Sequence, residues 1–231
     1  MKTALIILHQ DRSIPGDIGR KLINRGYNLD IRRPCIGDVL PNHLNEHALV
    51  VILGGPISVN DQADYIKYEI DWLKVVLDSG KPFLGICLGA QMLAKYLGCK
   101  VEKNSSKLVE IGFYPIKPTE DGRELFKNQE VFYQFHDEGF DIPTNSKLLA
   151  EGNRFKHQAF QYKNCYAFQF HPEVNFYLHI RWLYFVLLKN PKKLFVNGAQ
   201  NIIFQLYLRL KNNRRVSFWL DDFLDNYLLK N

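Results

Sequence analysis

Short β-type runs and helical patterns alternate through the first hundred residues of the chain. Buried-strand patterns are strongest at residues 3–8, 49–53 and 83–86, with a weaker one at 28–32. Between them, apolar residues at helical spacing predict helices, each closed by a nearby glycine, over residues 14–25, 66–77 and 88–97. Buried strands joined by helices are typical of a parallel sheet that is covered on both faces. We therefore expect an α/β fold.

The pattern changes at residue 99 and again after His171. Residues 99–170 are rich in aromatic and β-branched side chains and in turn signals, which predicts strands and hairpins with one short helix at 120–127. Helical periodicity then returns and predicts three helices, over residues 176–188, 191–211 and 216–229. No linker or repeat separates these parts. We expect one α/β domain over residues 1–190, with a helical extension over 191–231 packed on the same domain.

Composition narrows the class of protein. Apolar residues make up 46% and charged residues 23% of the 231 residues, which excludes a disordered or fibrous chain. The four cysteines are widely spaced and form no C-x-x-C pair, which argues against a disulfide scaffold or a zinc site and fits a reducing compartment. No apolar run is long enough for a signal peptide or a membrane span. We expect a cytoplasmic protein with no metal, no cofactor and no membrane contact.

The net charge of +6 is concentrated near the C-terminus. Residues 189–231 hold eight basic and three acidic side chains, so the rest of the chain is close to neutral. A basic segment can bind nucleic acid or an acidic partner, although solvated helix faces are the more ordinary explanation. The sequence carries no nucleic-acid-binding module, and we expect no nucleic-acid partner.

Residues 85–89 read GICLG at the junction between a predicted strand and a predicted helix. This is the thiol counterpart of the G-x-S-x-G nucleophile elbow. The glycines allow neighbouring elements to approach closely, and the N-terminus of the helix favours a thiolate at Cys87 and stabilises an oxyanion. A lone cysteine is more often a small buried apolar residue. The surrounding pattern favours a nucleophile.

A thiol nucleophile needs a base and a group that orients the base. Residues 171–173, HPE, supply both, because Pro172 keeps His171 out of the α region and residues i and i+2 of extended backbone face the same side. None of the six other histidines has a carboxylate two positions later across a proline. We therefore predict a catalytic triad of Cys87, His171 and Glu173.

Two glycines and a proline, Gly54-Gly55-Pro56, follow the buried strand at 49–53. Glycines at the carboxyl end of a strand let a backbone N–H approach a ligand, although an ordinary βα turn has the same composition. Together with the N–H of Leu88, the N–H of Gly55 would complete an oxyanion hole with two donors.

These segments together resemble the class I, triad-type glutamine amidotransferases. The resemblance runs along nearly the whole chain, through the segments LGGPISVND (53–61), GICLGAQ (85–91), EIG (110–112) and HPE (171–173). Residues 136–143, HDEGFDIP, and the C-terminal positions 198–200 and 219–228 are similar to the stand-alone branch related to the GMP synthetase glutaminase domain. The resemblance implies a flavodoxin-like, mostly parallel sheet with helices on both faces and a helical C-terminal cap.

The resemblance also implies hydrolysis of the side-chain amide of L-glutamine. Cys87 would attack the amide carbon, and His171 would protonate the departing ammonia and then activate water against the γ-glutamyl thioester. Gly55 and Leu88 correspond to oxyanion donors in this family.

Three further residues correspond to substrate contacts in the family. They are Gln91, Gln134 and His136. The pair Gln134-Phe135 departs from the small or polar residues that are usual there, which changes how the α-amino and α-carboxyl groups would be held. His136 has an alternative role in holding its own loop.

The sequence contains no phosphate-binding loop of either the G-x-x-x-x-G-K-[ST] or the S-G-G-x-D-S type, and we expect no ATP-using domain in this chain. Either the ammonia passes to a separate synthetase subunit, or the protein works alone. Two alternatives stay open: a hydrolase of γ-glutamyl peptides with the same triad, and a non-catalytic binding protein on the same scaffold. Nucleophile-elbow proteases and chaperones lack the HPE arrangement.

Overall fold

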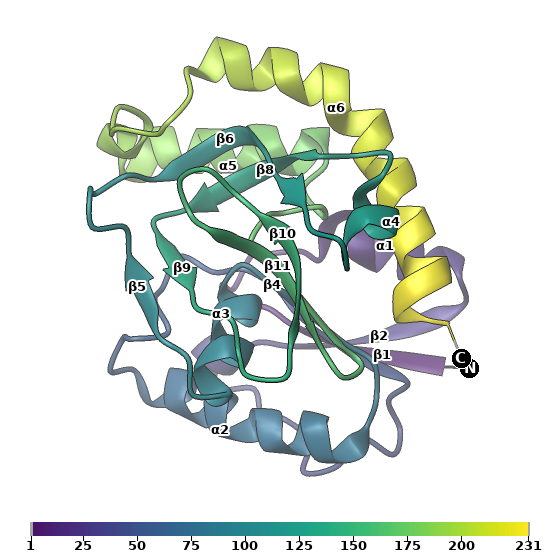
Figure 1. Ribbon diagram of the computed structural model, residues 1–231. Helices are drawn as coiled ribbons and strands as arrows, with labels where there is room; N and C mark the ends of the chain where they lie inside the picture. Colours follow the sequence, from purple (N-terminus) through teal and green to yellow (C-terminus); the bar gives the residue numbers. More distant parts are fainter. Residues whose placement is uncertain (1, 231) are drawn as a thin grey trace.

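A computed structural model describes residues 2–230 and is built around one sheet of eight strands (Figure 1). The spatial order is β2-β1-β3-β4-β12-β11-β10-β7. The first five strands in this order are mutually parallel, and the last three pair antiparallel. Their bounds are Lys2–Ile7 (β1), Tyr27–Arg32 (β2), Leu49–Ile52 (β3), Phe83–Ile86 (β4), Lys117–Pro118 (β7), Lys147–Glu151 (β10), His157–Tyr162 (β11) and Cys165–Phe168 (β12).

Two antiparallel pairs of strands lie outside this sheet. One joins β5 (Val101–Lys103) to β9 (Glu138–Phe140), and the other joins β6 (Glu110–Pro115) to β8 (Val131–His136). In Figure 1 the second pair lies at the top of the molecule beside α5.

Six α-helices surround the strands. They are α1 (Gly16–Asn24), α2 (Asp64–Ser79), α3 (Leu88–Tyr96), α4 (Arg123–Phe126), α5 (Phe176–Lys189) and α6 (Ile202–Phe223) among residues 2–230, with short 3-10 turns at Pro34–Ile36 and Pro191–Leu194 and a π turn at Leu224–Leu228. No helix in this range combines the length and apolar character that crossing a bilayer requires.

The sheet is buried on both faces because side chains alternate along its strands. Ala4 and Ile6 of β1 pack in one apolar cluster with α1, α4 and the second half of α6. Leu5 and Ile7 pack in the opposite cluster with α2 and α3. This arrangement confirms the expected α/β fold, with a mostly parallel sheet and helices on both faces.

The C-terminal helices differ from the sequence-based expectation. We predicted helices over 191–211 and 216–229, but α6 begins only at Ile202 and continues without a break through residues 212–215. The segment before α6 instead runs beside β6, where Gly198 adopts a φ of 104° and its carbonyl accepts a hydrogen bond from the N–H of Ile111 at 3.2 Å. Asn212 lies inside α6, and its side-chain amide donates to the carbonyl of Leu208 one turn earlier, at 2.9 Å.

Helix α6 packs against elements that precede it in the chain. Helix α6 contacts β6 and β8 through its first part and α1 through its later part. Arg209, one of the basic residues that we expected on a solvated face, is buried, with only 1% of its surface exposed.

The parallel strands bring three functional segments to one edge. Strands β3, β4 and β12 are neighbours, and their carboxyl ends point the same way. The chain leaves them at residues 53–55, 87–89 and 169–173, which are the segments that carry the predicted oxyanion hole, nucleophile and base. This edge is where open α/β sheets bind ligands.

Candidate active site

Cys87 lies on the sharp turn between β4 and α3. Its backbone has φ 51° and ψ −104°, and Leu88 is the first residue of the helix. A positive φ is strained for a residue with a side chain, and it persists because the turn is fixed on both sides. The N–H of Cys87 donates to Phe168 of β12 at 2.7 Å, and its carbonyl accepts from Gln91 at 3.0 Å. This is the backbone geometry of a nucleophile elbow.

The two glycines of the elbow allow the close packing around it. A Cβ atom at Gly85 would lie 2.6 Å from the carbonyl oxygen of Gly89. A Cβ atom at Gly89 would overlap the carbonyl oxygen of Ile52 on β3. Helix α3 can therefore rest directly on the backbone of the sheet only with glycine at both positions.

His171 is held between Glu173 and the loop after β3. Its Nδ1 lies 2.7 Å from Oε1 of Glu173, and both side chains are buried. On another side, a Cβ atom at Gly54 would lie 2.7 Å from Cε1 of His171 and 3.4 Å from Cβ of Cys87, so these three residues are immediate neighbours. The indole ring of Trp182 on α5 packs edge-on against the imidazole, with ring centroids 5.0 Å apart.

The charges around His171 favour its protonated form. Burial alone would lower the pKa of His171, but the Glu173 carboxylate and the sulfur of Cys87 together raise that pKa to about 10. The imidazole is therefore protonated at neutral pH. A protonated imidazole beside a cysteine stabilises the thiolate, which is the reactive form of the nucleophile.

The predicted oxyanion donors lie close to each other beside Cys87. Leu88 begins α3, and the N–H groups in the first turn of a helix have no partner within the helix. Gly55 lies in the loop after β3, where a Cβ atom on it would lie 3.0 Å from Cδ2 of Leu88. The two backbone segments thus approach each other at the nucleophile.

Gln91 lies near Cys87, one turn into α3. Its amide nitrogen donates to the carbonyl of Glu138 at 3.1 Å and to Oε1 of Gln169 at 3.3 Å. Gln91 is therefore linked to the nucleophile through Gln169, and its role as a substrate contact stays a prediction.

Gln134 and His136 lie in a buried polar cluster on β8. The amide of Gln134 donates to Gln158 at 2.7 Å, and its oxygen lies 3.2 Å from Nε2 of His136. His136 also lies 3.1 Å from Oε2 of Glu110 through Nε2, and 2.9 Å from the carbonyl of Glu138 through Nδ1. The last contact matches the loop-holding alternative, and substrate binding by either residue stays a prediction.

Sequence reasoning missed Gln169, which contacts Cys87. Its side chain is fully buried, and its amide nitrogen lies 3.7 Å from Sγ of Cys87. The available signal was its position, because Gln169 is a polar residue directly after the apolar strand β12 and only two positions before His171.

Trp182 is a second residue that sequence reasoning missed. It comes from an apolar helix whose pattern gives no sign of which residue faces the histidine. Among residues 2–230 the structure contains no cluster of three or more His, Cys, Asp or Glu side chains that could hold a metal ion.

Comparison with known proteins supplies the family. The model of the family described as glutamine amidotransferase class-I matches residues 9–185. YfeJ of Salmonella typhimurium, a glutamine amidotransferase-like protein, is 28% identical over 178 residues, which cover 72% of this chain and 74% of that protein. A subunit of the glutamine-hydrolysing GMP synthase of Sulfurisphaera tokodaii is 32% identical over 136 residues, which cover 57% of this chain and 70% of that protein.

Longer relatives and a solved structure agree with this assignment. The glutamine-hydrolysing GMP synthase of Wigglesworthia glossinidia brevipalpis is 34% identical over 140 residues, but the chain spans only 25% of that protein's length. The crystal structure of a glutamine amidotransferase from Thermotoga maritima superposes with a TM-score of 0.88 at 26% identity, over 99% of both chains. Because the family model matches well over half of its residues, the chain belongs to the class I glutamine amidotransferase family.

Proposed function

We propose that this chain hydrolyses the side-chain amide of L-glutamine through Cys87, His171 and Glu173. The observation that carries the proposal is the position of His171. Its ring lies next to Gly54 and Cys87 on one side, and its Nδ1 lies 2.7 Å from the buried carboxylate of Glu173 on the other. A nucleophile, a base and an orienting group in this order are the components of thiol catalysis.

In the first half of the proposed reaction the thiolate of Cys87 attacks the amide carbon. The carbonyl oxygen becomes an oxyanion, which the N–H groups of Gly55 and Leu88 stabilise. Protonated His171 gives its proton to the nitrogen as the carbon–nitrogen bond breaks, and ammonia leaves. A γ-glutamyl thioester on Cys87 remains.

In the second half, neutral His171 accepts a proton from water, which attacks the thioester. The carbon–sulfur bond breaks, glutamate is released, and the thiolate and the protonated imidazole are restored. Glu173 stabilises the cationic imidazole in both halves and orients the ring.

The proposed substrate contacts are Gln91, Gln134 and His136. Each already has protein partners, so each would exchange at least one hydrogen bond to reach a substrate. Gln91 is the best positioned, because its partner Gln169 contacts Cys87 directly.

We further propose that the ammonia passes to a separate synthetase subunit. Similarity to a relative named as one subunit of a GMP synthase supports this arrangement.

The four cysteines are all free thiols, which supports a reducing, cytoplasmic setting.

A substrate screen of the purified protein tests the proposal. We expect ammonia release from glutamine to exceed amino-acid release from γ-glutamyl peptides. The opposite preference would favour a γ-glutamyl peptide hydrolase, and turnover of neither would favour a non-catalytic protein.

The nucleophile is tested by Cys87→Ala, which we expect to remove all measurable turnover while the thermal unfolding temperature changes little. Cys165→Ala is the matched control, because Cys165 is equally a buried cysteine but lies on β12, where burial raises the pKa of its thiol to about 12. We expect Cys165→Ala to keep full activity. A folded Cys87→Ala protein with more than trace turnover would contradict the mechanism.

A further inference from the structure

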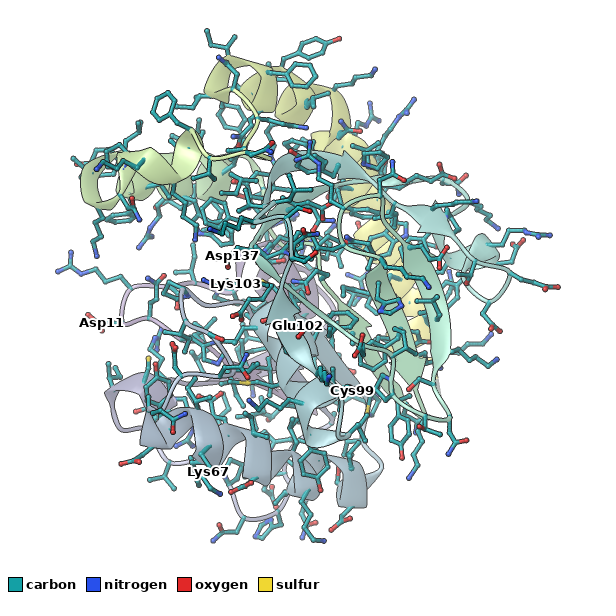
Figure 2. The ribbon with its side chains drawn as sticks, turned by 60° about the vertical axis from the view of Figure 1, so that its left-hand side comes forward. Asp11, Lys67, Cys99, Glu102, Lys103 and Asp137 are labelled. Atoms are coloured by element: carbon teal, nitrogen blue, oxygen red, sulfur yellow. The ribbon has the colours of Figure 1, made fainter. Side chains whose placement is uncertain are left out.

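A second buried histidine–carboxylate pair lies behind the site and takes no part in the proposed chemistry. His9 follows the end of β1, and its Nε2 lies 2.9 Å from Oε2 of Glu69 on α2. Both side chains are fully buried. Asp11, only two residues beyond His9, projects into solvent (Figure 2). The chain therefore leaves the core directly after His9.

His9 packs directly on the loop that carries the proposed oxyanion donor. Its Nδ1 lies 3.4 Å from the carbonyl oxygen of Gly54. A Cβ atom at Gly55 would lie 2.7 Å from Cβ of His9. On its other side the same loop contacts His171 and Cys87. The two glycines are therefore packed between His9 and the catalytic residues.

The contact with the Gly54 carbonyl determines the direction of the next N–H. In a trans peptide unit the C=O of one residue and the N–H of the next point in opposite directions, and the described chain has no cis peptide bond. Because the carbonyl of Gly54 points toward His9, the N–H of Gly55 points away from His9. We infer that His9, held by Glu69, is a positioning residue that keeps the N–H of Gly55 in the oxyanion hole. This inference rests on the proposed function.

The glycines make such a restraint necessary. Neither residue has a side chain, so the peptide between them can rotate at little steric cost. A rotation by half a turn would replace the N–H donor by a carbonyl oxygen and repel the developing oxyanion. A hydrogen bond to the carbonyl opposes this rotation.

The hydrogen bonds require a proton on Nδ1 of His9. The carbonyl of Gly54 can only accept, so Nδ1 must donate. Glu69 holds the opposite edge of the ring at Nε2, which keeps the ring in the orientation in which Nδ1 faces the loop.

Two substitutions of His9 separate positioning from simple packing. The amide nitrogen of the side chain in His9→Asn can take the place of Nδ1 and donate to Gly54, but it does not reach Glu69. In His9→Gln the amide nitrogen takes the place of Nε2 and can still donate to Glu69, but no group is left that donates to Gly54. A positioning role predicts that His9→Asn retains more activity, and a packing role predicts the opposite order.

We expect kcat of His9→Gln to fall roughly 100-fold, as for the loss of one oxyanion donor, with KM changed little. Turnover of His9→Asn should exceed that of His9→Gln by about 10-fold or more on the same basis.

Alkylation of Cys87 by iodoacetamide should keep its rate and pH profile in both variants, because this displacement at a saturated carbon creates no oxyanion. Glutamate γ-semialdehyde, which adds a thiolate to form an oxyanion, should inhibit His9→Gln less than the wild type.

His47 provides the matched control. It is a buried histidine whose Nε2 lies 3.0 Å from Asp30, and we expect His47→Gln to leave kcat unchanged. If His9→Gln does not fold, the double variant His9→Leu/Glu69→Leu carries the test, because it removes the donor to Gly54, leaves no unpaired buried charge and should lower kcat without changing alkylation.

Three outcomes would overturn the inference while leaving the proposed function intact. They are wild-type turnover in His9→Gln, higher turnover in His9→Gln than in His9→Asn, and a loss of alkylation parallel to the loss of kcat. A wild-type protein that reacts with iodoacetamide but hydrolyses no γ-glutamyl amide would overturn both.

Discussion

At the scale of single residues, the charge of each buried histidine depends on the groups packed around it. The ring of His171 has a carboxylate on one side and a sulfur nearby, so it keeps a proton in the interior. His179, also fully buried, lies next to a cation and is held neutral. The same residue type therefore performs opposite electrostatic roles in one chain, and only the neighbours decide which.

We expect Glu173→Gln to lower kcat less than His171→Ala. The amide can still hold the imidazole in place but cannot stabilise its charge, whereas alanine removes the base. Steady-state kinetics of both folded variants measures this difference. Equal losses would contradict the assigned roles.

The same pair makes a prediction about stability and pH. The pKa of His171 is raised from about 6.5 in the unfolded chain to about 10 in the folded protein, so its contribution to stability is complete below pH 6.5. That contribution is lost as the pH rises through 10. We expect the wild type to unfold at a higher temperature than Glu173→Gln near pH 7, with a gap that narrows toward pH 10. A constant gap would show that Glu173 does not hold the proton on His171.

At the scale of elements, contacts between backbones determine which glycines the fold requires. Helix α3 lies on β3 at Gly89, where there is no room for a Cβ atom. Most predicted strands and helices match the structure because their hydrophobic periods are local properties. The break that we expected at 212–215 is wrong because packing of Val216 and Trp219 in the core carries α6 straight through it.

We expect Gly89→Ala to destabilise the fold by about 1–3 kcal/mol or more, because α3 must move away from the sheet. Gly139→Ala is the matched control, since a Cβ atom there meets a side chain, the buried ring of Phe155, and not the backbone of a neighbouring strand. Urea unfolding of both variants measures the difference. Equal effects would mean that the close contact of α3 with β3 is not what restricts position 89.

The contact between α5 and α6 should be sensitive to acid. Nε of Arg209 donates to Nδ1 of His179 at 3.4 Å, and Nε2 of His179 donates to Gln205 at 3.3 Å. Burial, reinforced by Arg209, lowers the pKa of His179 to about 4. The unfolded chain therefore binds one more proton between pH 4 and 6.5, and stability falls as the pH falls through this range.

We expect His179→Gln to remove this part of the pH dependence. Thermal unfolding between pH 4 and 7 measures it, and the wild type should lose a few kcal/mol more than the variant over that range. Equal losses in both proteins would assign the acid sensitivity to other groups.

At the scale of the whole molecule, one region of the surface differs from the rest. Large exposed apolar side chains gather on α5, on residues 195–196 directly after the turn at Pro191–Leu194, and on α6, and no acidic residue occurs between Glu173 and Asp221. Lys192 and Lys193 lie in the same region. We expect a separate synthetase subunit to dock on the basic C-terminal segment around Lys192, Lys193, Arg214 and Arg215, which belongs to this region.

If the ammonia passes to such a partner, the isolated chain should turn over glutamine slowly, below the common enzyme range of about 1–1000 per second. Adding the partner should raise turnover, and the effect should weaken with salt because exposed charges are screened over about 8 Å at physiological ionic strength. Turnover already within that range for the isolated chain would favour a self-contained hydrolase.

Features that depend on near neighbours in the chain could be predicted from the amino-acid sequence alone. The elbow around Cys87, the i, i+2 relation of His171 and Glu173 and the alternation along the strands all follow from local backbone geometry. The resemblance to class I glutamine amidotransferases could also be recognised from the sequence, because it rests on short contiguous motifs.

Contacts between groups that are far apart in the chain could be seen only in the three-dimensional fold. It brought His9 against Gly54 and Glu69 across 45 and 60 positions of the chain. It also enclosed Gln134 and His136 in a polar cluster with Glu110 and buried Arg209 in a segment that reads as solvated. Such partners depend on strand order and on the packing of helices against the sheet, which the periodicity of a single segment does not specify.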